Sequence, residues 1–163
     1  MSAFVADLAR TLNFEYKDSD KNTYNGLEMM NFYWPEWDMQ SYKENPANEK
    51  YFTKHDGTIN MTSVCGAYAI ATKGHFYQVS EDLKNDLSII KGHDGKIIES
   101  NPDEDDTKLG IEKNSGVTVQ ARQRIQINFL MNKNQSLFSH LKENYVMPFV
   151  FVKRDSIMSQ DQV

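Results

Sequence analysis

The sequence predicts a β-rich α+β fold, a twisted antiparallel sheet with a few short peripheral helices. The main observation is the segment 117–131, in which apolar or small residues alternate with polar ones. A period of two residues is typical of a strand with one buried face and one face in water. This strand is more than twice the usual length of about five or six residues, so it has to curl around a core. Two turn signals, Asn25-Gly26 and Asn114-Ser115-Gly116, separate strand-like runs and support the same fold class.

The first half of the chain combines one predicted helix with two short strands. Phe4, Val5, Leu8 and Leu12 lie at helical spacing and predict a helix, and Ser2 can cap its N-terminus. Strands are predicted at residues 14–16 and 29–34, on either side of the Asn25-Gly26 turn. Residues 35–59 are predicted to be loop.

The second half surrounds the long strand with shorter elements. A short strand is predicted at residues 67–72, and Ser80, followed by Glu81 and Asp82, predicts the start of an amphipathic helix. One or two helical turns are predicted at residues 136–141. The last strand is predicted at residues 145–152, where Pro148 indicates a sheet edge or a bulge. Residues 153–163 are expected to form a flexible tail.

Composition indicates one domain with a thin core. The chain has 163 residues, a formal charge of −5 and an apolar share of 39%, against roughly 45–50% in ordinary globular chains. Lys and Arg form no cluster in the sequence that could bind the phosphates of a nucleic acid, which argues against nucleic acid as a partner. Nothing approaches the roughly 18 consecutive apolar residues of a membrane span, and Asp7 and Arg10 interrupt any signal-peptide core near the N-terminus.

The long strand and the turn before it carry a family resemblance. Ile111-Glu112, Ser115-Gly116 and the run from Ala121 to Asn128 resemble the Ile-Glu-Pro-x-Thr-Gly turn and the Ala-x-Arg-hydrophobic-Gln-hydrophobic-Asn strand of the class B scavenger receptors. That family comprises fatty-acid translocases, lysosomal integral membrane receptors and insect sensory-neuron membrane proteins. Other segments resemble further motifs of the same family and occur in the same order. They are Asp7-Leu8-Ala9-Arg10, Gly26-Leu27 with Phe32 and Pro35, Glu44-Asn45-Pro46-Ala47-Asn48, Cys65-Gly66-Ala67, His75-Phe76-Tyr77, Asn101-Pro102-Asp103-Glu104 and Tyr145-Val146-Met147-Pro148.

The resemblance implies that residues 1–163 correspond to the C-terminal half of a scavenger-receptor ectodomain. In that family, strands from both halves build a barrel around a lipid tunnel, and a membrane span lies near each terminus. The implied partners are lipids, fatty acids or lipoproteins, with no cofactor. The implied location is the extracellular or luminal side of the plasma membrane or the lysosomal membrane. Two alternatives stay open: a non-functional truncated gene copy, and a small soluble enzyme or binding module that reuses the fold.

The resemblance also places candidate site residues. The tunnel-wall candidates are Val119, Ile125, Ile127, Phe129, Phe149 and Phe151, although an ordinary core needs the same residue types. Arg122 and Arg124 lie on the polar side of the strand, where we favour a solvated face over a site for anionic lipid. The only cysteine, Cys65, matches a family half-cystine whose partner is absent. We therefore expect a buried thiol, with intermolecular pairing as the alternative.

The sequence shows no catalytic or metal-binding constellation. The four histidines are scattered and form no zinc-binding spacing. The acidic run 103–106 lacks the ligand spacing of a calcium loop and is expected to be solvated. Two acceptor triplets for N-linked glycosylation, at Asn60 and Asn134, would matter only in a secreted or luminal chain.

Overall fold

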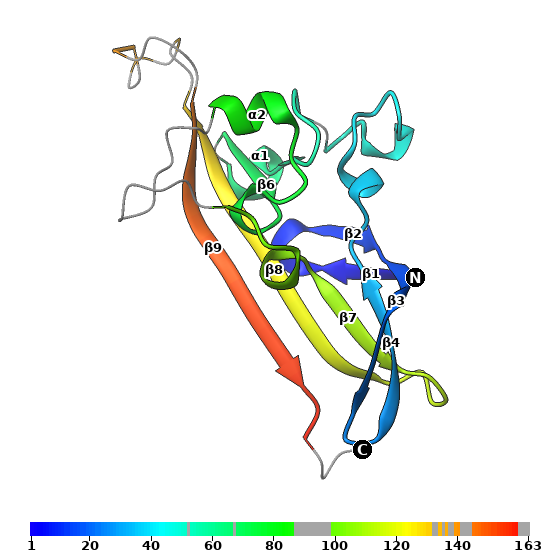
Figure 1. Ribbon diagram of the computed structural model, residues 1–163. Coiled ribbons are helices and arrows are strands. Elements are labelled where there is room, and N and C mark those ends of the chain that lie inside the picture. The colour runs from blue at the N-terminus through cyan, green and yellow to red at the C-terminus, as the bar shows by residue number, and fades with distance from the viewer. Residues whose placement is uncertain are drawn as a thin grey trace.

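The computed structural model describes residues 1–51, 53–66, 68–86, 99–131, 134, 136, 139–140 and 145–159. Antiparallel strands dominate this part of the chain, as the sequence predicts (Figure 1). The strands are β1 (Ser2–Val5), β2 (Arg10–Asn13), β3 (Glu15–Tyr24), β4 (Leu27–Tyr33), β5 (Ile59–Asn60), β6 (Ala69–Thr72), β7 (Lys108–Glu112), β8 (Thr118–Met131) and β9 (Tyr145–Ile157). The helices are α1 (Thr62–Cys65), α2 (Glu81–Asp86) and α3 (Pro102–Asp105), with 3-10 turns η1 (Ala6–Leu8), η2 (Glu36–Met39), η3 (Pro46–Asn48) and η4 (Gly74–Phe76).

Strand β8 organises the larger sheet. The seven strands follow the order β3-β4-β7-β8-β6-β5, and β9 joins at β8. A strand has two edges, and β8 uses both: β9 pairs with residues 120–131 along one edge, while β7 and then β6 pair along the other. The expected neighbours of the long strand, residues 67–72 and 145–152, are thus confirmed in β6 and β9. Within the described residues the sheet remains open.

The predicted turns form where the sequence places them. Asn25 and Gly26 both have positive φ, of 51° and 83°, and connect β3 to β4 in a tight hairpin. Between β7 and β8, the Glu112 carboxylate accepts the backbone N–H groups of Asn114 at 2.9 Å and Ser115 at 2.6 Å. The pKa of Glu112 is lowered to about 2, most strongly by a hydrogen bond from the side chain of Ser115 and then by these backbone hydrogen bonds from Asn114 and Ser115.

The predicted N-terminal helix is wrong. Residues 2–13 form the hairpin of β1 and β2 around η1, and Ala9 turns the chain with a φ of 49°. Leu8 and Leu12 are buried as expected, but Phe4 is 69% exposed. The helical spacing therefore did not mark a common buried face. Instead, this hairpin lies across one face of the larger sheet and packs Leu8 and Leu12 into the core that contains Ile125.

Two other expectations change. The flexible tail expected at residues 153–163 is wrong for its first part, because β9 continues to Ile157 and pairs Lys153 with Arg124 and Asp155 with Arg122. Residues 160–163 lie outside the described residues. The helix predicted from Ser80 is confirmed as α2 up to Asp86, while its predicted continuation and much of the segment 136–141 lie outside the described residues.

Candidate functional site

The alternation in β8 predicts one buried face and one solvated face, but the structure shows a different arrangement. We call the side carrying Val119, Ile125, Ile127 and Phe129 the apolar face, and the side carrying Arg122, Arg124, Gln126 and Asn128 the polar face. The polar face was expected to be solvated, which is wrong, because Arg124, Gln126 and Asn128 are all buried. Both faces of β8 are therefore covered over part of their length.

The apolar face is covered only in part. Val119 and Ile125 are fully buried, and Ile125 belongs to the main core cluster with Leu8 and Leu12. Ile127 and Phe129, nearer the C-terminal end of β8, pack only at the margin of that cluster and stay partly exposed. Of the tunnel-wall candidates on β8, these two are the ones with surface left for a ligand.

The exposed apolar surface continues onto β9. Met147 pairs with Phe129 and Val150 pairs with Ile127, so these side chains share one face of the sheet. A bulge at Pro148 leaves Phe149 as the extra residue, and its ring lies 4.7 Å from the ring of Phe129, centroid to centroid. Phe149 is 64% exposed, and Met147 and Val150 are each 41% exposed. We call Ile127, Phe129, Met147, Phe149 and Val150 the apolar strip.

The apolar strip therefore contains three tunnel-wall candidates that were predicted from sequence, Ile127, Phe129 and Phe149. It also contains two residues that the sequence analysis did not propose as tunnel wall. Met147 and Val150 could have been found by alternation from the predicted strand and the predicted bulge at Pro148. Phe151 lies elsewhere, because it pairs with Gln126 of the polar face and packs edge-on against His75 at 4.9 Å.

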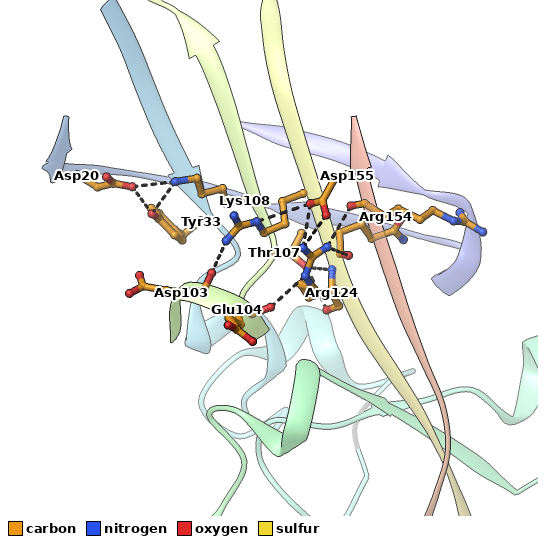
Figure 2. Close-up of polar contacts among 11 residues, drawn as sticks. Asp20, Tyr33, Asp103, Glu104, Thr107, Lys108, Arg124, Arg154 and Asp155 are labelled. Carbon is orange, nitrogen blue, oxygen red and sulfur yellow. Dashed lines mark hydrogen bonds and ion pairs between the residues drawn. The ribbon is translucent and has the colours of Figure 1, made fainter. Parts of the chain in front are cut away.

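On the polar face, Arg124 forms a clamp between β8 and β9. Its Nη2 donates to both carboxylate oxygens of Asp155, at 2.9 and 2.8 Å, while its other nitrogens donate to the backbone carbonyls of Glu104, Gln123 and Arg154. Figure 2 shows Arg124 and Asp155 facing each other across the two strands, with the α3 residues Asp103 and Glu104 beside them. The hydrogen bond from Arg124 lowers the pKa of Asp155 below its ordinary value.

These contacts change the interpretation of the two arginines. Arg122 donates to the carbonyl of Asp103, and its Nε lies 3.7 Å from Asp155. Neither arginine is simply solvated, and the hydrogen-bonding groups of Arg124 are occupied within the fold. The clamp holds β8 and β9 together on one face and leaves the apolar strip open on the other.

Part of the acidic run 103–106 is buried in the fold. Asp105 and Asp106 are buried, which contradicts a fully solvated loop, while Asp103 and Glu104 remain exposed. Asp105 contacts Nδ1 of His75 at 2.7 Å and accepts the backbone N–H of Asn101 at 2.7 Å. This pairing ties α3 to η4, and both elements cover the polar face of β8.

Cys65 and Asn134 lie at the surface, and Asn60 is partly exposed. The expectation of a buried thiol is wrong, because Cys65 is exposed at the end of α1. Asn60 lies on β5, and Asn134 lies in an exposed turn whose neighbour Gln135 is outside the described residues. In the part of the chain that the structure describes, no helix is long and apolar enough to cross a membrane.

Comparison with known proteins agrees with the motifs. The CD36 family, which comprises the class B scavenger receptors, matches residues 1–163. A Caenorhabditis elegans protein named "Uncharacterized protein C03F11.3" is 27% identical over 183 aligned residues, which cover all of this chain and 30% of that protein. The chain thus spans less than a third of the length of the relative it matches. It belongs to the CD36 family.

Proposed function

We propose that this chain supplies part of an apolar wall that contacts the acyl chains of lipids in a receptor ectodomain. The observation that carries the proposal is the apolar strip, where five large side chains of β8 and β9 remain partly or largely exposed on one face. Contiguous exposed apolar surface is uncommon on soluble proteins and marks an interaction site. Family membership favours lipids and lipoproteins as the ligand class and the extracellular or luminal side of a membrane as the location.

In this proposal, one face of β9 contacts lipid through its side chains, and the outer backbone edge of β9 pairs with another strand. Its side chains present the apolar strip, whereas its outer backbone edge has no strand beside it among the described residues. The relative is more than three times as long as this chain, so in a longer protein another segment could supply a strand for that edge. Pairing there would extend the wall without covering the strip, because backbone hydrogen bonds lie in the plane of the sheet and side chains stand out of it.

The strip suits an acyl chain better than a polar ligand. Ile127, Phe129, Met147, Phe149 and Val150 offer no charged group, and each methylene of a lipid that leaves water contributes about 0.8 kcal/mol. The flexible thioether of Met147 can adapt to acyl chains of different shape. The charged clamp lies on the opposite face, so it does not put a desolvated charge into the wall.

Replacing Phe149 by Asp tests the proposal. An unpaired carboxylate on an apolar wall costs roughly 1–3 kcal/mol or more when a ligand desolvates it, so the affinity for a fluorescent long-chain fatty acid should fall by about tenfold or more. The matched control is Phe4→Asp, because Phe4 is equally exposed but lies on β1 of the small sheet. Equal fatty-acid affinity in the wild-type and Phe149→Asp proteins would contradict the proposal, provided that both have the same circular dichroism spectrum.

A further inference from the structure

The triplet Asn60-Met61-Thr62 joins the edge strand β5 to α1. Strand β5 ends the path of the larger sheet, and it pairs with β6 through Ile59 and Asn60. Met61 is completely buried in the main core cluster, whereas Asn60 is partly exposed and Thr62 is exposed. The middle residue therefore anchors the triplet, and the two residues that a glycosylating enzyme must recognise flank it at the surface.

We propose that Asn60 is a site of N-linked glycosylation and that its glycan covers the exposed surface of α1. The inference rests on the proposed function, because only a luminal or extracellular chain meets the glycosylating enzyme. The co-reactant is an oligosaccharide linked to a lipid pyrophosphate. Nδ2 of Asn60 would form a bond to the anomeric carbon of the first sugar while the bond from that carbon to the pyrophosphate oxygen breaks. The pyrophosphate leaves with the electron pair, and the proton that the amide loses passes to the solvent.

The folded structure leaves the side-chain nitrogen of Asn60 able to carry a glycan. Oδ1 of Asn60 accepts the backbone N–H of Thr62 at 2.9 Å, and the backbone N–H of Asn60 donates to the carbonyl of Tyr51 at 2.6 Å. The carbonyl side of the amide is thereby fixed against its own backbone. Among the described residues Nδ2 has no hydrogen-bond acceptor, so glycosylation would not break a contact seen there.

The surface next to Asn60 is one that a glycan would protect. The backbone N–H of Cys65 donates to the carbonyl of Met61 at 2.9 Å, so the helical turn that begins at the triplet ends at the exposed thiol. Val64 and Tyr68, beside it in the sequence, are 44% and 62% exposed. A hydrated glycan on Asn60 would screen these apolar side chains and the thiol from other chains, and it would also block pairing at the β5 edge.

The experiment translates the 163-residue chain behind a cleavable signal peptide in the presence of microsomes. The supplied signal peptide makes the chain luminal, so the result depends on the site and not on the proposed receptor function, which the fatty-acid measurement tests separately. The readout is the gel mobility of the protease-protected chain before and after treatment with an N-glycosidase. The variants are Asn60→Gln, Thr62→Ala, Thr62→Ser and Asn134→Gln.

The proposal predicts that Asn134→Gln keeps one glycosidase-sensitive mobility step, that Thr62→Ser also keeps the step at Asn60, and that Asn60→Gln and Thr62→Ala lose it. A luminal Asn134→Gln chain without any shift would overturn the proposal. Screening of the thiol is tested on non-reducing gels, where Asn60→Gln should increase disulfide-linked dimer at least severalfold and Asn60→Gln with Cys65→Ser should abolish it. An unchanged dimer fraction in Asn60→Gln would overturn the protective role of the glycan.

Discussion

Replacing Lys73 by Met is expected to lower the free energy of unfolding by about 3–5 kcal/mol, because it leaves the buried carboxylate of Asp106 without its cation. Nζ of Lys73 has no exposed surface and lies 2.7 Å from Oδ1 of Asp106, with further hydrogen bonds to the Trp34 carbonyl and to Gln78. A small domain has only about 5–15 kcal/mol of stability in total. Urea unfolding followed by tryptophan fluorescence would measure the loss.

The matched control is Lys84→Met. Lys84 pairs with Glu81 at 2.7 Å on the surface of α2, and such pairs contribute less than about 1 kcal/mol. The double variant Lys73→Met with Asp106→Asn should recover most of the lost stability, because the buried charge is gone. A loss in Lys73→Met no larger than that in Lys84→Met would contradict the buried pair.

The loss in Lys73→Met should also depend on pH. Burial raises the pKa of Asp106 above its ordinary value of 3.8, and removal of Lys73 takes away the charge that opposes this rise. A carboxyl group with a raised pKa in the folded state favours folding while it is protonated and opposes folding once the pH rises above the unfolded value. The destabilisation should therefore be smallest near pH 4 and should grow toward pH 7.

The isolated chain is expected to self-associate through β9. This strand has 13 residues and pairs only with β8 within the described chain, so its outer N–H and C=O groups form an unpaired edge beside the apolar strip. Pro148, Lys153 and Arg154 limit pairing at some positions but leave Phe149 to Val152 uninterrupted. Light scattering after size-exclusion chromatography should show oligomers, and a hydrophobic dye should bind.

Lysine substitution separates this edge from the rest of the surface. Val150→Lys should shift the protein toward monomer and reduce dye binding severalfold, because a charge at an edge opposes strand addition. Tyr68→Lys is the control, since Tyr68 is exposed but precedes β6. A wild-type chain that is monomeric and unfolds cooperatively with a normal denaturant slope would show instead that the 163 residues form a self-contained domain.

The sequence predicted the centre of the sheet better than its margins. The alternation at residues 117–131 correctly placed β8, and the short apolar strands on either side of it followed. The predicted strand at residues 14–16 covers only the beginning of β3. The rest of β3 was missed because its residues are nearly all polar and exposed, and its place is set by pairing with β4 through the Asn25-Gly26 turn. The N-terminal hairpin was missed because Leu8 and Leu12 are buried in either conformation, and only the contact with the larger sheet selects β1 and β2.

The site was predictable on one face and not on the other. An apolar residue on an alternating strand is either core or binding surface, and the sequence could not tell buried Ile125 from accessible Phe129. That difference depends on where the β1–β2 hairpin lies. The burial of Arg124 and Asn128 was not foreseeable from the strand itself, because some of their hydrogen-bond partners lie far away in the sequence: Asp155 is 31 positions from Arg124, and Thr72 is 56 positions from Asn128.

The most direct measurement of lipid contact is photolabelling with a fatty acid that carries a diazirine in the middle of its acyl chain. After illumination of the purified protein, mass spectrometry of proteolytic peptides would locate the label. Contact at the apolar strip predicts label on residues 145–152 of β9 and on Ile127 or Phe129 of β8, with label strongly reduced in Phe149→Asp. Label concentrated on the β1–β2 hairpin, or on the opposite face around His75 and Phe151, would contradict a lipid wall at this position.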